Sequence, residues 1–326
     1  MNMKLKNRIY IIGFLLCLFH SYICAQTRVK ENVPFDSVLI ADPFIYPDTL
    51  TKTYYMVGTK GTGQMWKSKD LKNWSGPYSY LNWNKDSWIG KNPKIWAPEI
   101  HKYNGKYFCF VTFTNESITH FANNQDLPRR ASHILWSDSI MGPYTEINDT
   151  LYLPEDKCTL DGTLWVDTDN HPYLVYSFEW VQNIFGVMEA IKLSDDLSFP
   201  EGKAFELFNA KEGVWSKKKN VIDGPFVFRT KTGKLGMLWS CWVGGKYSQG
   251  VAYSESGTLK GPWVQEKKML TPPNVGHGMM FHTFEGELLL LSHSWYNTKS
   301  NSTRYPILFK VDDSGDRLKL IERYRP

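Results

Sequence analysis

Three aspartates stand in similar surroundings in the sequence, and together they suit one acid–base site. Asp42 lies in "LIADPF", Asp161 in "CTLDGTLW" and Asp223 in "NVIDGPF", and each is followed by Pro or Gly. Three carboxylates that face one cavity repel one another, so the pKa of some of them must rise. Acid–base chemistry by carboxyl groups requires such shifts. The alternative is that each aspartate only forms a turn, because Asp-Gly and Asp-Pro are common turn pairs.

A repeated order of segments favours the shared site. Five segments open with a similar head motif and continue with an alternating strand, a turn and a strongly apolar strand. The heads are Asp42, Pro98, Asp161, Asp223 and His277, at intervals of 56, 63, 62 and 54 residues. Repeats of this length with about four short strands are typical of a propeller, and no stretch shows helical periodicity over three or more turns.

We therefore predict one all-β domain over residues 26–326, a five-bladed β-propeller with four-stranded antiparallel blades around a central channel. In a propeller the first strand of every blade lines the channel. Residues at equivalent positions then converge from different directions, although Asp42 and Asp223 lie 181 residues apart.

Residues 1–25 have the pattern of a secretory signal peptide. Three basic residues precede an apolar run over residues 9–19, and the small residue Ala25 offers a cleavage position. The apolar run is too short for a membrane span. The sequence thus predicts an exported protein, whether periplasmic, secreted or at the cell surface. Lipid anchoring at Cys24 is the alternative, which the lack of a small residue just before it disfavours.

Charge and cysteine content exclude several classes of function. The formal net charge is +5, and removal of the three basic residues of the leader lowers it to +2. A charge this small predicts no strong attraction to nucleic acid or membrane surfaces. The remaining cysteines, Cys109, Cys158 and Cys241, are too few and too scattered for a disulfide framework or a zinc site. The oligomeric state is left open.

The ordered motifs "ADPF", "WAPE", "LDGTLW" and "GHG" resemble glycoside hydrolase family 43 over nearly all of the mature chain. The resemblance implies a five-bladed propeller that hydrolyses glycosidic bonds with inversion and requires no cofactor. The implied substrates are α-L-arabinofuranosides and β-D-xylosides, or β-galactosides in some branches. It also implies that Asp42 is the general base, that Asp161 tunes the acid and holds the sugar, and that the general acid opens the fourth blade.

The fourth head departs from the family pattern, because Asp223-Gly224-Pro225 stands where the family usually has Glu-Gly-Pro. Aspartate is one methylene shorter, which retracts the carboxyl group by about 1.5 Å. An inverting pair must leave room for a water between carboxyl groups about 6.5–9.5 Å apart. We interpret Asp223 as a working acid. The alternatives are a carbohydrate-binding propeller that has lost catalysis, or a replacement acid at Glu179 or Glu189.

Aromatic and basic residues near the heads are candidates for sugar contacts. Trp96 is expected to form the floor of the sugar site, because aromatic faces pack well against the apolar faces of sugars. Phe44, Phe113 and Trp165 follow strand openings and are expected on the same wall. Arg304 is a candidate for binding a sugar hydroxyl, with a solvated loop arginine as the alternative.

His277 opens the fifth repeat. By resemblance to arabinan-cleaving members of the family, it is a candidate ligand of calcium or another ion on the propeller axis. A single imidazole is a poor calcium ligand, because that ion prefers oxygen. The alternative is a pocket histidine that hydrogen-bonds a carboxylate.

Together with the leader, the resemblance implies an exported inverting glycoside hydrolase that releases α-L-arabinofuranosyl or β-D-xylosyl units from plant cell-wall glycans. The long segment over residues 115–133 is expected to close one end of the site, which favours exo action. Trp295 and Tyr296 are candidates for contact with an outer sugar. A relative acting on fructosides is disfavoured, since its Arg-Asp-Pro and Glu-Cys motifs do not occur.

Overall fold

The computed structural model describes residues 28–148, 151–216, 220–295 and 303–326. The predicted signal peptide over residues 1–25, with Cys24, and the candidate sugar contact Tyr296 lie outside the described residues. Within the described part of the chain, no helix has the length and apolar character needed to cross a membrane. The three cysteines, Cys109, Cys158 and Cys241, are buried, and none of them forms a disulfide bond.

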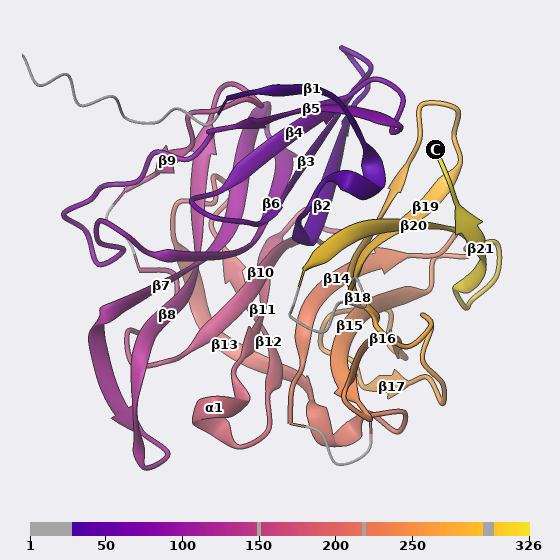
Figure 1. The fold of residues 1–326 in the computed structure, drawn as a ribbon. Helices are drawn as coiled ribbons and strands as arrows, with labels where there is room; N and C mark the ends of the chain where they lie inside the picture. The colour runs from indigo at the N-terminus through magenta and orange to yellow at the C-terminus, as the bar shows by residue number, and fades with distance from the viewer. Residues whose placement is uncertain (1–27, 149–150, 217–219, 296–302) are drawn as a thin grey trace, which may run out of the picture.

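Antiparallel strands form five blades in chain order, which confirms the predicted all-β class and the four-stranded blades (Figure 1). The strands of the first two blades are β2 (Ala41–Asp48), β3 (Thr53–Thr59), β4 (Gln64–Ser68) and β5 (Asn73–Tyr78), then β6 (Lys94–Tyr103), β7 (Lys106–Ala122), β8 (Gln125–Ser137) and β9 (Thr145–Glu146). The third blade has β10 (Thr159–Val166), β11 (Pro172–Phe178), β12 (Val187–Leu193) and β13 (Pro200–Asn209).

The strands of the last two blades are β14 (Asp223–Arg229), β15 (Leu235–Val243), β16 (Lys246–Ser254) and β17 (Trp263–Gln265), then β18 (Val275–His282), β19 (Leu288–Trp295), β20 (Arg304–Asp312) and β21 (Lys319–Tyr324). An additional strand, β1 (Lys30–Pro34), pairs with the outer strand β5. The short helices are η1 (Phe35–Ser37), α1 (Trp180–Asn183) and η2 (Ala210–Glu212). The long segment singled out in the sequence is the tip of the β7–β8 hairpin.

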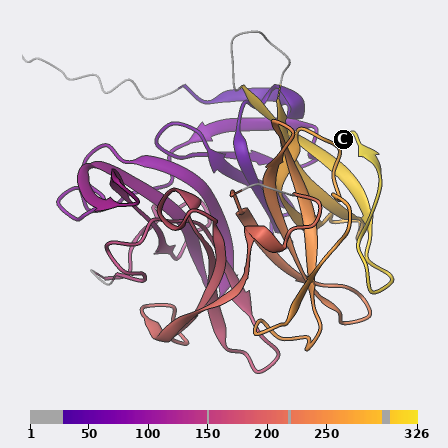
Figure 2. The ribbon, with the colours of Figure 1, turned by 90° about the horizontal axis from the view of Figure 1, so that it is seen from below.

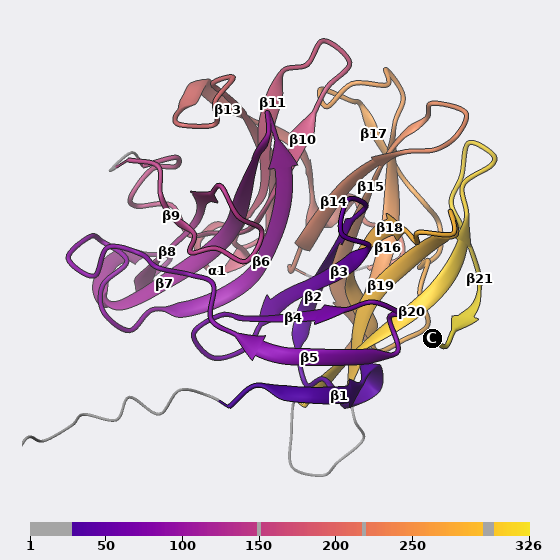
Figure 3. The same cartoon turned by 90° about the horizontal axis from the view of Figure 1, so that it is seen from above.

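The first strand of each blade lies at the centre of the molecule. Each inner strand contacts the next one around the ring, from β2 to β6, β10, β14 and β18, and β18 contacts β2 again. Seen from above, these inner strands surround the middle, while β5, β13 and β21 lie outward (Figure 3). Seen from below, the blades follow one another in chain order, and the last lies beside the first (Figure 2).

All five inner strands carry the same irregularity. The pairing of each inner strand with the second strand of its blade shifts by a bulge at the head motif. The first residue of each bulge has a positive φ, between 38° and 57°, and these residues are Asp42, Ala97, Asp161, Gly224 and His277. The equivalent positions are therefore Ala97 rather than Pro98 and Gly224 rather than Asp223, which corrects two of the predicted heads by one residue.

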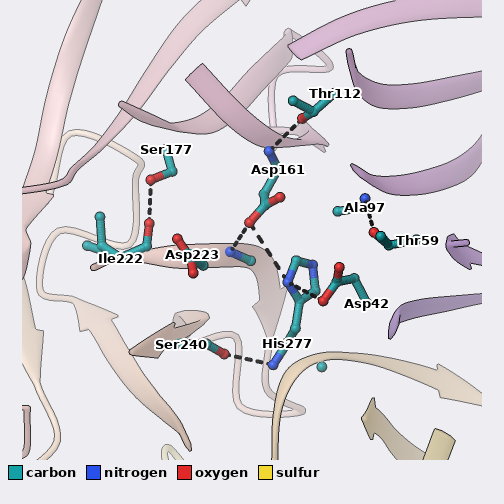
Figure 4. A network of polar contacts seen from close by, with 12 residues as sticks. Asp42, Thr59, Ala97, Thr112, Asp161, Ser177, Ile222, Asp223, Ser240 and His277 are labelled. Carbon is teal, nitrogen blue, oxygen red and sulfur yellow. Dashed lines mark hydrogen bonds and ion pairs between the residues drawn. The ribbon is translucent and has the colours of Figure 1, made fainter. Parts of the chain in front are cut away.

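A ring of side-chain hydrogen bonds joins each blade to the next. The residues opposite the bulges are Thr59, Thr112, Ser177, Ser240 and His293. Four of them accept from the bulge amide of the following blade, over 2.7 Å at Ala97, 2.9 Å at Asp161, 2.8 Å at His277 and 3.0 Å at Asp42. Ser177 instead donates to the carbonyl oxygen of Ile222 (Figure 4). The four amide bonds satisfy backbone N–H groups that the bulges remove from the ladder.

Side chains rather than paired strands join the last blade to the first. Within the described residues, no strand pairing links the sheet of β2–β5 to that of β18–β21. The Asp42–His293 bond spans this junction, and Tyr54 stacks on Phe284 with ring centroids 4.2 Å apart. The amide of Phe284 also donates to the Tyr54 hydroxyl over 3.0 Å. The closed ring thus depends on polar and aromatic contacts at this junction.

Candidate active site

A cavity of about 390 Å³ lies at the end of the channel where the heads converge, and its walls come from all five blades. Cavities of this size suit small organic ligands or sugar units. The lining residues are Asp42, Trp96, Arg130, Leu160, Asp161, Glu179, Trp180, Val181, Val221, Asp223, Trp242, Tyr247, His277, His293 and Arg304. The structure therefore brings the three aspartates singled out in the sequence into one cavity.

Asp42 is buried, with polar and cationic groups around its carboxylate. Its Oδ1 lies 3.4 Å from Nδ1 of His277, 3.2 Å from Nδ1 of His293 and 4.0 Å from the Arg304 guanidinium. Burial opposes ionisation, but the neighbouring groups, His277 first among them, outweigh it and hold the pKa of Asp42 well below its usual range. An ionised carboxylate at a cavity wall is suited to accept a proton.

Asp161 connects the two sides of the cavity. Its Oδ2 accepts a 2.9 Å hydrogen bond from the amide of Gly224 and lies 3.8 Å from Nδ1 of His277. Burial, and after it the charges of Asp223 and Asp42, raise the pKa of Asp161 well above its usual value, while the Gly224 amide opposes the shift. The carboxyl group of Asp161 thus fixes the backbone that carries Asp223.

Asp223 immediately precedes the bulge of the fourth blade, at the position that Trp96 occupies in the second blade. The Tyr247 hydroxyl donates to its Oδ2 over 3.2 Å. Burial, followed by the neighbouring charge of Glu179, raises the pKa of Asp223 to about 7. A Cβ on Gly224 would come within 3.0 Å of the His277 ring, so the glycine lets the head of this blade pack against the fifth.

Glu179 also lies in the cavity wall, where it is paired with Arg130. Nη1 of Arg130 lies 2.6 Å from both carboxylate oxygens of Glu179, and its Nε donates to Thr114 over 2.8 Å. Burial raises the pKa of Glu179, and Arg130 opposes that shift. The other alternative acid, Glu189, lies outside the cavity lining and pairs with Lys157 at 2.5 Å. Of the two alternative acids, only Glu179 remains a candidate by position.

His277 contacts two carboxylates, as one reading of the sequence expected, since Nδ1 faces both Asp42 and Asp161. Among the described residues, possible metal-ligating atoms of three side chains gather within 4.8 Å only at Asp167, Asp169 and His171, in the β10–β11 turn. His277 is not in that group. Its surroundings offer one imidazole and two already engaged carboxylates, which do not form the oxygen-rich ligand set of calcium. We assign no step of the chemistry to an ion.

The predicted sugar contacts divide into two groups. Trp96 and Arg304 line the cavity, and the guanidinium of Arg304 lies over the Trp295 ring at 4.9 Å. Phe44, Phe113 and Trp165 do not line it. They pack between neighbouring blades. Phe44 of the first blade contacts the His101 ring of the second, and Trp165 of the third lies under Arg229 of the fourth. Phe113 of the second blade contacts Trp83 in the segment that joins the first two blades. We therefore correct the expectation for these three side chains and assign them to blade packing.

Eight cavity residues were not singled out from the sequence, and Arg130, Trp180, Tyr247 and His293 are among them. His293 carries a readable signal, since it is a polar residue in the apolar run "LLLLSHSW" at the position of Thr59 and Thr112. Tyr247 follows a Gly-Gly turn and gives no comparable signal. Arg130 and Trp180 reach the cavity only because the long hairpin and α1 lie beside it.

Comparison with known proteins agrees with this geometry. The model of the family described as Glycosyl hydrolases family 43 matches residues 32–315. A curated relative, extracellular endo-α-(1→5)-L-arabinanase 1 of Bacillus subtilis, is 22% identical over 250 residues, which cover 71% of this chain and 70% of that protein.

Solved structures give the same result. The endo-arabinase from Bacteroides thetaiotaomicron is 33% identical with a TM-score of 0.75, over 86% of this chain and 97% of that chain. An endo-1,4-β-xylanase from the same organism is 22% identical with a TM-score of 0.70, over 92% of this chain and 99% of that chain. At this level of identity the likeness shows the fold alone. The chain therefore belongs to glycosyl hydrolase family 43, whose members hydrolyse O-glycosyl bonds on a five-bladed propeller.

Proposed function

We propose that this protein is an inverting glycoside hydrolase that cleaves α-L-arabinofuranosyl linkages in arabinan-type glycans. The observation that carries the proposal is the opposite environment of two carboxyl groups in one cavity. The pKa of Asp42 is held well below its usual range, whereas that of Asp223 is raised to about 7. Two carboxyl groups whose pKa values are driven apart suit a base and an acid.

In this mechanism Asp42 accepts a proton from the attacking water, and Asp223 donates one to the departing glycosidic oxygen. The two groups lie on either side of the Asp161–His277 contact (Figure 4). Attack from one side and departure on the other invert the configuration at the anomeric carbon. Near pH 7 the ionised Asp42 and the protonated fraction of Asp223 coexist, as the reaction requires.

The contacts around Asp223 support its use as the acid despite its short side chain. The Tyr247 hydroxyl holds one carboxylate oxygen, and Asp161 binds the amide of the next residue, Gly224. Both bonds keep the carboxyl group at the cavity wall, so little of the binding energy is needed to orient it.

The choice of sugar rests on the relatives. The curated relative is described as acting on α-(1→5)-L-arabinan, and the 33% identical structure is described as an endo-arabinase. β-D-Xylosyl units remain the second candidate, which the xylanase likeness supports only through the fold.

Export is part of the proposal. The basic and apolar leader predicts it, and the curated relative from Bacillus subtilis is described as extracellular. N-terminal sequencing of the protein recovered outside the cytoplasm tests this, and the predicted mature chain begins at Gln26.

Proton NMR of the first-formed sugar tests the function. The protein is incubated with linear α-1,5-arabino-oligosaccharides and, in parallel, with xylo-oligosaccharides. We expect the β-anomer of arabinose or of a shorter arabino-oligosaccharide to accumulate before mutarotation, and the product lengths report exo or endo action. Binding of arabino-oligosaccharides in calorimetry without any product would instead establish a carbohydrate-binding propeller.

A further inference from the structure

The cavity wall beside Asp223 is built by two segments that the mechanism above does not use, the β7–β8 hairpin and α1. The hairpin is fastened to α1, because the side-chain amides of Asn123 and Gln125 each donate to the carbonyl oxygen of Val181 over 3.1 Å. Both segments lie at the same lower end of the molecule (Figure 1). They form one continuous wall rather than two independent loops.

An ion pair presents hydrogen-bonding groups on this wall. The side chains of Arg130 and Glu179 are 20% and 8% exposed, and both line the cavity. Nε and Nη1 of Arg130 are occupied by Thr114 and Glu179, and the guanidinium lies 5.3 Å over the Trp96 ring. Among the described residues, none accepts a hydrogen bond from Nη2 of Arg130. The Arg130 guanidinium can donate hydrogen bonds and the Glu179 carboxylate beside it can accept them, so the pair is suited to bind neighbouring hydroxyls of a sugar.

An exposed aromatic ring stands next to the ion pair. Trp180 lines the cavity yet is 40% exposed. The segment that carries it ends at Ile184, a β-branched residue with φ of 62°, a backbone conformation that costs free energy and is rare for this residue type. An indole ring held at a cavity mouth is suited to pack against the apolar face of a sugar.

The position of these groups relative to Asp223 indicates which sugar they would meet. The bond from Ser177 to Ile222 joins the end of β11 to the residue before Asp223, and Glu179 and Trp180 follow Ser177 by two and three residues. Asp42, with His293, lies on the other side of the site. The acid protonates the departing oxygen, so the leaving sugar must lie on the Asp223 side.

We propose that Arg130, Glu179 and Trp180 form a subsite for the sugar unit on the leaving-group side of the scissile bond. The ion pair binds hydroxyls of that unit, and Trp180 packs against its apolar face. This inference rests on the proposed glycosidase function and adds that the enzyme prefers substrates whose leaving group is itself a sugar.

Substrates with and without a leaving sugar test the subsite. For Trp180→Ala we expect kcat/KM for arabinotriose to fall about two- to twelvefold, since aromatic packing is worth roughly 0.5–1.5 kcal/mol, while kcat/KM for methyl α-L-arabinofuranoside changes less than twofold. Trp180→Phe should recover most of the loss. Phe199→Ala is the matched control, since Phe199 is also exposed, at 48%, but does not line the cavity.

An equal loss on both substrates would overturn the inference, because it would mean that the wall only supports the fold. An unchanged kcat/KM for arabinotriose would overturn it as well. If the wild-type protein cleaves neither substrate, the proposed function fails, and calorimetry with arabinotriose then tests the subsite alone. Weaker binding by Trp180→Ala than by Phe199→Ala supports it, and equal binding contradicts it.

Discussion

The backbone N–H of Asp42 donates a 3.0 Å hydrogen bond to Nδ1 of His293, across the junction between the first and last blades. Three of the other four bonds in the inter-blade ring have a hydroxyl acceptor and the fourth a backbone carbonyl, whereas the acceptor here is an imidazole. Burial lowers the pKa of His293 to about 4, so the ring is neutral at pH 7 and its Nδ1 is free to accept. The same residue thus closes the propeller and holds the backbone of the proposed base.

Replacing His293 with Ala should therefore impair both stability and activity. The amide of Asp42 would lose its buried partner, which costs about 1–3 kcal/mol of the free energy of unfolding. Thermal unfolding followed by circular dichroism should show a midpoint lower by several degrees, and kcat should fall because the base is no longer fixed.

Ser240→Ala is the matched control, since Ser240 makes the equivalent bond to His277 at the junction of the fourth and fifth blades. That junction is also joined by strand pairing between Ser248 and Val275. We expect a smaller loss of stability there. A loss as large as that of His293→Ala would show that the first–last junction has no special dependence on its side-chain bond.

The pH profile of kcat/KM should have its alkaline limb near neutrality. Only the protonated form of Asp223 donates a proton, and with a pKa raised to about 7 this form disappears as the pH rises through 7. Asp42, whose pKa lies well below its usual range, stays ionised throughout and adds no acidic limb near pH 5. Initial rates between pH 4 and pH 9 test this, and a flat profile above pH 7 would exclude Asp223 as the acid.

Asp42→Asn should lower kcat by about 10²–10⁴-fold, because water loses its general base. Added azide, which needs no base, should restore turnover and give a glycosyl azide of inverted configuration. Asp48→Asn is the control on the same strand, since Asp48 caps the turn at Thr51 and lies outside the cavity lining. Recovery of a glycosyl azide of retained configuration would contradict an inverting mechanism.

The sequence was sufficient for the five repeats and for the convergence of Asp42, Asp161 and Asp223, because the head motifs recur in order. It was not sufficient to predict which single side chains of the inner strands face the cavity. A bulge breaks the two-residue alternation of a strand, so Phe44 and Trp165, which follow the heads closely, were expected on the cavity wall, whereas they pack between neighbouring blades.

The remaining cavity residues could not be predicted for a different reason. Arg130 and Trp180 reach the site from a second-blade hairpin and from a four-residue helix in the third blade. Their positions depend on how these segments lie against the channel mouth, which no local periodicity encodes. His293 was accessible in principle, as the polar residue that recurs opposite each bulge.

The most direct test of the central claim compares wild type and Asp223→Asn on an arabino-oligosaccharide and on a nitrophenyl α-L-arabinofuranoside. Protonation matters most when the leaving group is poor, and general-acid assistance is worth about 10²–10⁴-fold. We predict that the variant loses this factor on the oligosaccharide and far less on the nitrophenyl glycoside. Equal losses on both substrates, or a variant as active as wild type on the oligosaccharide, would contradict the assignment of Asp223 as the acid and leave Glu179 as the candidate.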